Sequence, residues 1–241
     1  MTVKAGALVL WDIDRTLLYV GDVDQQIYRD VFFELLGRAP SILPERGTGI
    51  TTPIVLRRLF ADGGVPDQEI SALTRRAMSL LPLRLAGHRD EFSHDRVVMP
   101  GALAALEAVG ARAWLVQTVV SGNLRANALI KLAAAGLDGC LDLDVAAFAS
   151  DDDDRPSLVG IAQRRAGRRY GVTFDRANTV IIGDSREDVR TGLLGGSAVI
   201  GVASGTTTRS QLEDAGADIV LDDLSDAAAI LAAVDTLTSS R

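Results

Sequence analysis

Two aspartates separated by one residue follow an apolar run near the start of the chain. The run is Leu8 to Trp11, and the acids are Asp12 and Asp14. In an extended chain alternate residues share a face, so both carboxylates begin on one side of the strand end. Carboxylates this close repel each other unless a cation or a shared proton relieves them. The pair therefore indicates an active site, and a turn or helix N-cap that uses Asp14 and Thr16 is the structural alternative.

Such a pair suits phosphoryl transfer. Asp12 can attack a phosphorus atom in line and form an aspartyl phosphate. Asp14 can protonate the leaving oxygen and then deprotonate the water that releases phosphate. A hard cation held by oxygen ligands is needed to bring an anionic nucleophile to an anionic phosphate, and Mg²⁺ meets that need. The predicted activity is that of a Mg²⁺-dependent phosphomonoester hydrolase, a phosphatase.

Two further apolar strands end in polar residues of suitable chemistry, Ser121 and Asp184. In a parallel sheet both would share one edge with Asp12, where ligands of α/β proteins bind. Ser121 and Gly122 can offer a hydroxyl and backbone N–H groups to phosphate, unless Ser121 only caps the helix that follows. We expect Asp184 to bind the metal ion together with Asp12.

Arg155 and Asp188 extend this set of candidates. Arg155 can neutralise phosphate oxygens, or it can be a surface arginine after the acidic run Asp151–Asp154, a solvated loop. Asp188 can hold the metal's waters or a neighbouring ligand, although Ser185 and Asp188 also match a capping box. We expect Thr16 and Asp188 to support the site rather than to react.

Composition and charge exclude several classes of protein. The net charge of −7 over 241 residues repels nucleic acid and anionic membranes. Cys140 is the only cysteine, so no intrachain disulfide forms. The chain shows no signal-peptide pattern and no apolar run near the roughly 18–20 residues that span a bilayer. We expect a soluble cytoplasmic protein whose partner is a small phosphorylated metabolite; no pattern points to an oligomeric state.

The hydrophobic pattern divides the chain into a helical segment and a segment of alternating strands and helices. Strands are expected over residues 5–12, 113–120, 145–148, 179–182, 198–202 and 218–221. This alternation predicts an α/β protein with a parallel sheet covered on both faces. The core comprises residues 1–20 and 96–241, and an all-helical cap over residues 21–95 lies at the carboxyl end of the sheet. Pro82 is expected to break or kink a cap helix.

Taken in order, these residues resemble the haloacid dehalogenase-like (HAD) hydrolase superfamily. The segments similar to its four motifs are Asp12-x-Asp14-x-Thr16, Ser121, Arg155-Pro156 and Gly183-Asp184-Ser185-x-x-Asp188. The helical insertion looks like the small cap of the phosphoglycolate phosphatase-like branch. The resemblance implies a Rossmann-like core, Asp12 as nucleophile, Asp14 as acid and base, and Mg²⁺ contacts from Asp12, the Asp14 carbonyl and Asp184.

Two residues depart from the family pattern. Arg15 stands where glycine is usual, and Arg155 stands where lysine is usual and differs from it in geometry. We expect no other lysine to replace it, because Lys131 lies inside the helix after Ser121. The departures keep open a catalytically weak member that binds a ligand or a partner. A phosphomutase of the same fold, which shares the nucleophile and the acid and base, is a further alternative.

Two other patterns are assigned no chemistry. The glycine-rich stretch Arg46–Thr51 lacks the Lys-Ser/Thr ending of a phosphate-binding P-loop, so we expect an ordinary loop, and a loop that faces the site from the cap is the alternative. His88 and His94 lie in a polar stretch at a spacing that does not suit a helical pair. We expect them at the surface or at a hinge.

Overall fold

The computed structural model describes residues 5–45, 49–92 and 97–238. These ranges contain a six-stranded parallel sheet with strand order β3-β2-β1-β4-β5-β6. The strands are β1 (Ala7–Trp11), β2 (Leu115–Ser121), β3 (Ala147–Phe148), β4 (Thr179–Gly183), β5 (Ala198–Val202) and β6 (Ile219–Leu221). Each confirms a strand expected from the sequence, with bounds that differ by two residues or fewer.

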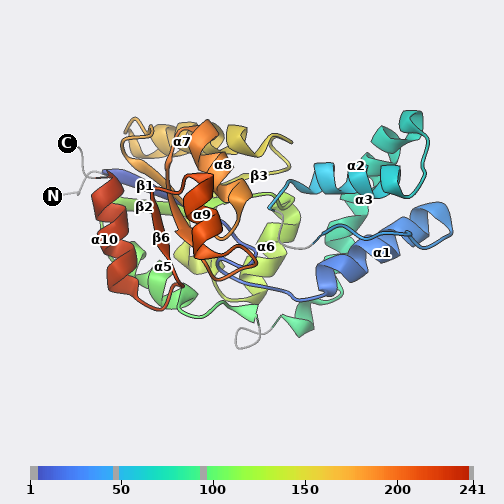
Figure 1. Ribbon diagram of the computed structural model, residues 1–241, viewed down its shortest axis with the longest axis horizontal. Helices are drawn as coiled ribbons and strands as arrows, with labels where there is room; N and C mark the ends of the chain where they lie inside the picture. The colour runs from blue at the N-terminus through green and yellow to red at the C-terminus, as the bar shows by residue number, and fades with distance from the viewer. Residues whose placement is uncertain (1–4, 46–48, 93–96, 239–241) are drawn as a thin grey trace.

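Helices cover both faces of this sheet (Figure 1). One face carries α7 (Arg155–Tyr170), α8 (Arg186–Gly195) and α9 (Arg209–Ala215), and the other carries α5 (Ala102–Gly110), α6 (Arg125–Ala134) and α10 (Ala227–Thr238). Successive side chains of β1 alternate between two apolar cores: Val9 packs on the side of α5, and Leu10 on the side of α7. The predicted α/β fold with a covered parallel sheet is confirmed.

The central strand β1 is held in place by a buried polar network as well as by apolar packing. Trp11 Nε1 donates a hydrogen bond to Gln117 Oε1 at 3.1 Å. Gln117 Nε2 donates to the carbonyl oxygens of Leu106 and Cys140, each at 2.8 Å. These polar groups are buried and paired, so the network fixes β1 against β2 and α5. The chain that leaves β1 therefore starts from a rigid base.

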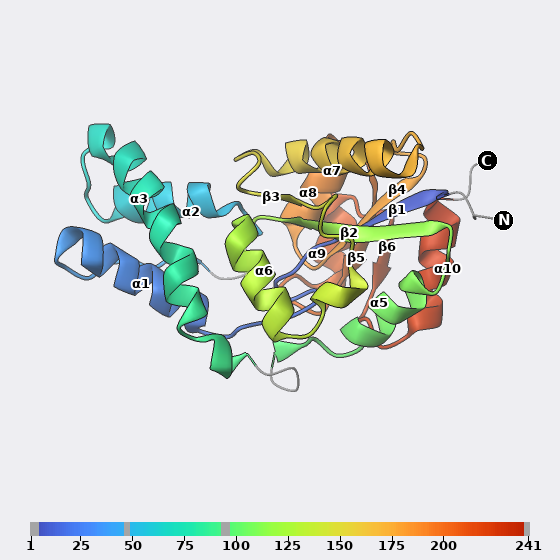
Figure 2. The same ribbon diagram turned by 180° about the vertical axis from the view of Figure 1, so that it is seen from behind.

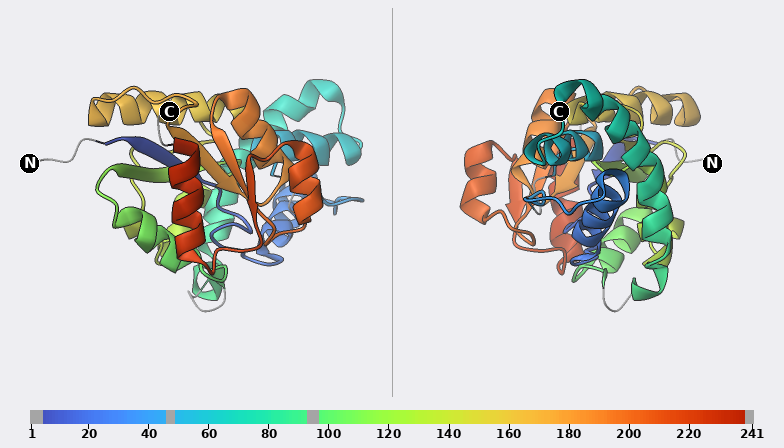
Figure 3. Two further views of the ribbon diagram at one scale, coloured as in Figure 1. Left: turned by 60° about the vertical axis from the view of Figure 1, so that its left-hand side comes forward. Right: turned by 90° about the vertical axis from the view of Figure 1, so that its right-hand side faces the viewer.

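Between β1 and α5, the described residues include three α-helices of a helical insertion. They are α1 (Val23–Leu36), α2 (Thr52–Asp62) and α3 (Asp67–Ala86). The short 3-10 helix η1 (Arg89–Glu91) lies between α3 and α5, and a second one, η2 (Asp138–Cys140), lies between α6 and β3. The insertion lies beyond the carboxyl edge of the sheet, in front of it in the right-hand view of Figure 3. Helix α3 packs against α6 (Figure 2). None of the described helices is long and apolar enough to cross a membrane.

Helix α3 continues through Pro82 to Ala86, so the chain does not break at this proline. A proline inside a helix removes one backbone hydrogen bond. Leu81 and Leu85 flank it and are fully buried in the core, at 2% and 0% exposure. Their packing outweighs the lost hydrogen bond, because most helical stability in proteins comes from buried apolar faces.

The two connections between the insertion and the sheet run side by side. Tyr19 N donates to the carbonyl oxygen of Val97 at 2.7 Å, and Met99 N donates to that of Leu17 at 3.0 Å. Leu18 pairs with Val98 in an isolated antiparallel bridge. The insertion is therefore joined to the core at one narrow base.

Candidate active site

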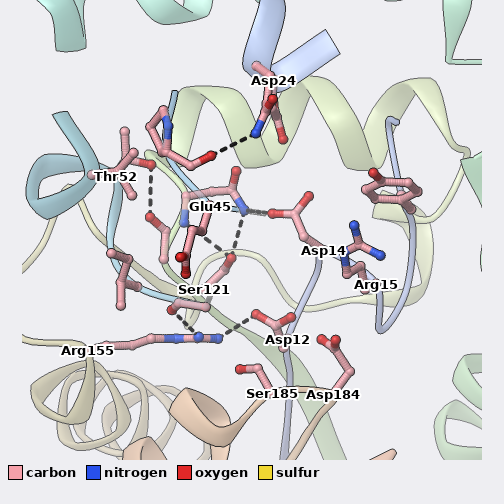
Figure 4. A pocket seen from close by; sticks show the side chains of 18 of the residues that line it. Asp12, Asp14, Arg15, Asp24, Glu45, Thr52, Ser121, Arg155, Asp184 and Ser185 are labelled. Carbon is pink, nitrogen blue, oxygen red and sulfur yellow. Dashed lines mark hydrogen bonds and ion pairs between the residues drawn. The ribbon is translucent and has the colours of Figure 1, made fainter. Parts of the chain in front are cut away.

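The sheet edge and the helical insertion enclose a cavity of about 130 Å³ (Figure 4). Its lining includes the predicted residues Asp12, Asp14, Ser121, Gly122, Arg155 and Asp184. Thr16 and Asp188 do not line the cavity, but each binds a side chain that does. The insertion contributes Asp24, Glu45 and Thr52. The structure thus brings the predicted residues together at one cavity, and the insertion adds polar groups that the sequence argument did not identify.

Three buried carboxylates gather below the cavity. Asp12, Asp184 and Asp188 each offer an oxygen within 4.8 Å of the others. Thr16 Oγ1 donates to Asp184 Oδ1 at 3.3 Å, whereas the buried Asp184 Oδ2 has no hydrogen-bond partner among the described residues. Burial and the neighbouring Asp188 raise the pKa of Asp184 to about 8. The cluster holds more negative charge than its surroundings compensate.

Arg155 supplies part of the missing positive charge. It is 2% exposed, and its Nη2 donates to Asp12 Oδ1 and to Asp188 Oδ1, both at 2.5 Å. Figure 4 shows its guanidinium extending toward Asp12. Burial and Asp188 nevertheless keep the pKa of Asp12 well above its usual value, against the effect of Arg155. The surface alternative for Arg155 is therefore wrong, and its single charge does not neutralise the cluster.

The residues present fit a divalent cation. All three side chains offer oxygen ligands, which Mg²⁺ prefers, and Asp184 Oδ2 lacks a partner in the part of the chain described. Gly205 lies directly against this oxygen, since a Cβ there would come within 1.7 Å of it. The metal contact expected of Asp14 is through its backbone carbonyl, and its side chain lies outside this cluster. The reason is that its carboxylate turns toward other partners.

Those partners are Lys131 and Asn123. Lys131 Nζ donates to Asp14 Oδ1 at 2.9 Å, and Asn123 Nδ2 donates to Asp14 Oδ2 at 2.6 Å. Lys131 also binds Asp24 Oδ2 at 2.7 Å and Asn123 Oδ1 at 3.2 Å. Lys131 lies in α6 as expected, and its long side chain reaches inward to Asp14, a contact that the sequence argument did not identify.

A helical pattern in the sequence could have identified Lys131. Asn123, Asn127 and Lys131 recur every fourth residue, the spacing that places side chains on one helix face, and are at most 9% exposed. Burial alone would lower the pKa of Lys131, but Asp14 and Asp24 raise it well above its usual value. Lys131 is therefore charged at neutral pH.

Ser121 is the last residue of β2, and Gly122 follows it in the loop that leads to α6. Helix α6 begins at Arg125 with Leu124 as N-cap, so the alternative that Ser121 caps it is wrong. Instead Ser121 Oγ accepts hydrogen bonds from the backbone and the side-chain nitrogen of Asn123, at 3.3 and 2.9 Å. The Gly122 carbonyl accepts from Thr52 N at 2.8 Å and Thr52 Oγ1 at 3.0 Å. The insertion thus rests directly on this loop.

The fourth motif serves a structural and a chemical purpose together. Ser185 N donates to Asp188 Oδ2 at 2.9 Å and Asp188 N donates to Ser185 Oγ at 3.2 Å, which is the predicted capping box of α8. The other oxygen, Asp188 Oδ1, binds Arg155. Asp188 therefore anchors Arg155 from the start of a rigid helix.

Arg15 occupies a tight turn after Asp14. Its φ of 65° lies in the left-handed region that favours glycine. Its guanidinium lies 4.1 Å from the centre of the Tyr19 ring, at the cavity wall. Among the described residues no helix begins before Val23, so the N-cap alternative for Asp14 and Thr16 is wrong. The backbone does turn at residues 15–17, but the side chains of Asp14 and Thr16 bind Lys131, Asn123 and Asp184 rather than this turn.

The remaining patterns have structural explanations. The acidic run is exposed as expected, and three of its members form ion pairs: Asp151 with Arg165 at 2.6 Å, Asp153 with Arg57 at 2.7 Å and Asp154 with Arg190 at 3.9 Å. His88 contacts Glu91 at 2.8 Å. His94 and residues 46–48 of the glycine-rich stretch lie outside the described residues.

Comparisons with known proteins agree with this geometry. The chain is 24% identical over 237 residues to "Probable phosphatase IndB" of Dickeya dadantii, covering 97% of this chain and 96% of that protein. Crystal structures of β-phosphoglucomutase from Clostridium difficile and of CbbY from Rhodobacter sphaeroides in complex with phosphate share its fold. The β-phosphoglucomutase matches at a TM-score of 0.66 with 15% identity, and the match covers 92% of this chain and 92% of that one. CbbY also matches at a TM-score of 0.66, with 21% identity, and the match covers 91% of this chain and 95% of that one.

Two family models match as well. A model described as HAD-hydrolase-like matches residues 158–227. The model of the haloacid dehalogenase-like hydrolases matches residues 9–192, which contain Asp12, Ser121, Arg155 and Asp184. The chain belongs to the haloacid dehalogenase-like hydrolase family.

Proposed function

We propose that this chain is a Mg²⁺-dependent phosphomonoester hydrolase that acts on a small phosphorylated metabolite. The observation that carries the proposal is the position of Asp12, a carboxylate at the end of a rigid central strand and at the floor of a cavity. It has Arg155 on one side, at 2.5 Å, and the buried carboxylate of Asp184 on the other. A nucleophile, a cation for phosphate oxygens and a candidate metal site thus meet at one point.

Asp12 attacks phosphorus and receives the phosphoryl group as an aspartyl phosphate. Arg155 and the N–H groups that follow Ser121 stabilise the negative charge on the transferring oxygens. The residues that would hold Mg²⁺ are Asp12, Asp184 and the carbonyl of Asp14. The ion would supply positive charge that brings the anionic phosphate to the anionic nucleophile.

Asp14 protonates the leaving oxygen and later takes a proton from the water that hydrolyses the aspartyl phosphate. Its two carboxylate oxygens are held by Lys131 and Asn123. These contacts leave Asp14 on the cavity wall, where it can meet the leaving group.

We further propose that residues 21–95 form a cap and that residues 1–20 and 96–241 form the core. Residues 46–48 and 93–96 of this division lie outside the described part of the chain. The contact of Thr52 with Gly122 closes the cavity on the cap side. A closed cap excludes water until the aspartyl phosphate has formed.

Hydrolysis of 4-nitrophenyl phosphate with and without Mg²⁺ tests this function. The wild type is expected to release nitrophenol only with Mg²⁺, and Asp12→Asn is expected to be slower by about 1000-fold or more, since a covalent step is lost. Asp214→Asn, an exposed acid on α9, is the matched control and keeps wild-type rates. Equal rates for wild type and Asp12→Asn would exclude Asp12 as the nucleophile.

A phosphomutase is the second candidate, since the fold is shared with a β-phosphoglucomutase. It uses the same aspartyl phosphate but returns the phosphoryl group to a second hydroxyl of the substrate. Sugar phosphates incubated with the protein distinguish the two activities: a hydrolase releases inorganic phosphate, whereas a mutase yields an isomeric sugar phosphate. Thermal stabilisation by phosphate and Mg²⁺ without either product would instead indicate a catalytically weak binding protein.

A further inference from the structure

Asp14, the proposed acid and base, is held by side chains from outside its own loop. Its Oδ1 accepts from Lys131 Nζ at 2.9 Å and its Oδ2 from Asn123 Nδ2 at 2.6 Å. Asn123 belongs to the loop after β2, and Lys131 belongs to α6. The direction in which Asp14 presents its carboxyl group to the cavity is therefore fixed by these two donors.

Lys131 has a second carboxylate partner, and this one comes from the helical insertion. Asp24 lies in the first turn of α1, and its Oδ2 accepts from Lys131 Nζ at 2.7 Å. The third N–H of the ammonium points to Asn123 Oδ1 at 3.2 Å. Lys131 is 1% exposed, whereas the side chains of Asp14 and Asp24 are each 35% exposed, so a buried ammonium holds two carboxylates that line the cavity. A single buried ammonium thus joins the insertion to the proposed acid and base.

The charges make this link sensitive to the position of the insertion. Removing one carboxylate from a buried ammonium leaves charge there that is less well compensated, which is unfavourable. A movement of α1 away from the sheet edge would take Asp24 from the ammonium and leave Lys131 with partners from the core alone. The position of Lys131, and with it the direction of Asp14, would then change.

We propose that Lys131 is a positioning residue that sets the orientation of Asp14 through Asp24, so that the acid and base is aligned when the helical insertion rests on the core. The inference rests on the proposed phosphatase function and adds a route by which the insertion acts on the chemistry. In this account Lys131 touches neither the substrate nor the metal.

The leaving group of the substrate separates this role from a purely structural one. Phenolate is a poor leaving group that needs protonation by Asp14, whereas 4-nitrophenolate leaves without a proton. A loss of alignment at Asp14 therefore slows phosphoryl transfer from phenyl phosphate much more than from 4-nitrophenyl phosphate. A general loosening of the fold slows both to the same extent.

The experiment measures release of phenol or nitrophenol in single turnovers with excess protein and Mg²⁺. Lys131→Gln removes the ammonium, and Asp24→Asn removes the partner on the insertion while Lys131 stays paired with Asp14. Arg57→Gln is the matched control, since Arg57 on α2 pairs with Asp153 of the core at 2.7 Å and contacts no residue of the Asp14 network. Melting curves in the same buffer report whether each variant is folded.

Lys131→Gln is expected to slow phenol release about 10-fold or more beyond its effect on nitrophenol release, as part of the 100-fold or greater contribution of an acid catalyst. Asp24→Asn is expected to shift the ratio in the same direction by less, and Arg57→Gln to leave it unchanged. The double variant with Lys131→Gln and Asp24→Asn should show the same ratio of phenol release to nitrophenol release as Lys131→Gln alone, because both substitutions break the same link between Asp24 and Asp14.

Equal slowing of both esters by Lys131→Gln and Asp24→Asn would overturn the inference and leave the phosphatase proposal intact. If Lys131→Gln is unfolded, the ratio for Asp24→Asn decides alone. A wild type that hydrolyses neither ester overturns the proposed function and the inference together.

Discussion

Arg155 and Lys131 each join an aspartate of the core to the helical insertion, but the charge around them differs. Near Arg155, the described residues include three clustered carboxylates, and Asp184 Oδ2 has no partner among them. Near Lys131, Asp14 and Asp24 share the ammonium, and each of its N–H groups has an acceptor.

This difference indicates which part of the site is incomplete in the protein alone. The Arg155 side has surplus negative charge, because three carboxylates lie beside one guanidinium and Asp184 Oδ2 lacks a partner among the described residues, and a divalent cation would relieve it. The Lys131 side is satisfied by protein groups. Metal removal should therefore alter the surroundings of Asp12 and leave the contacts of Asp14 with Lys131 in place.

Asp184→Asn is the substitution expected to disturb the incomplete side most. Loss of a proposed metal ligand should weaken Mg²⁺ binding by at least about 100-fold, since even partners of metal ligands contribute 10–100-fold. Turnover should fall with it, while the metal-free protein becomes more stable at alkaline pH because a buried charge is gone. Calorimetric titration with Mg²⁺ and melting curves check both effects. Unchanged Mg²⁺ affinity would show that the cluster is not the metal site.

The pH dependence of stability should report the same charge surplus. Asp184 has a pKa of about 8 in the folded protein and about 4 when unfolded, so the folded state binds the extra proton between these values. Its contribution to stability is therefore lost as pH rises from about 4 to about 8. The rise in melting temperature caused by Mg²⁺ should increase over this range in the wild type and not in Asp184→Asn. A Mg²⁺-induced rise in melting temperature that stays constant over this pH range in the wild type would contradict the raised pKa of Asp184.

Arg155→Lys tests the role of the guanidinium fork. A lysine keeps the charge but is a point donor, and it cannot hold Asp12, Asp188 and the carbonyl of Gly49 in the same planar geometry. We expect turnover of 4-nitrophenyl phosphate to fall by about tenfold, the equivalent of one charge-assisted hydrogen bond. Steady-state kinetics measure this effect. A loss as large as that of Asp12→Asn would show that Arg155 does more than neutralise charge.

Arg15 should give the smallest effects. Its φ of 65° suits glycine, and its guanidinium stacks on Tyr19. Arg15→Gly and Arg15→Ala both lose the stacking, but only Arg15→Gly relieves the backbone. Arg15→Gly should therefore be the more stable of the two by about 1 kcal/mol. Chemical denaturation checks this, and equal stability would mean that the backbone at this position is not strained.

The sequence predicted the sheet and the residues at its edge because both depend on local patterns. Short apolar runs marked the strands, and a parallel sheet necessarily brings Asp12, Ser121 and Asp184 to one edge. The capping box of Ser185 and Asp188 was also readable, since it depends on residues three apart.

The contacts of Lys131 and Arg155 were not predictable in the same way. The bond from Lys131 to Asp24 joins residues 107 positions apart, and it depends on how α1 sits against α6. Arg155 was a candidate for the site, but its position after four acids suited a surface arginine as well. Only the start of α7 at the sheet edge, which directs this side chain inward to Asp12 and Asp188, separates the two. Such contacts arise from tertiary packing, which the spacing of residues in one segment does not contain.

The central claim, that Asp12 carries the phosphoryl group, can be tested directly by trapping it. Protein mixed with Mg²⁺ and 4-nitrophenyl phosphate is quenched in acid and treated with borohydride, which reduces an aspartyl phosphate to homoserine. Peptide mass spectrometry then locates the modified residue. We predict homoserine at position 12 in the wild type and at no position in Asp12→Asn. Homoserine at another aspartate, Asp14 included, or its absence from a wild type that releases nitrophenol, would contradict the account.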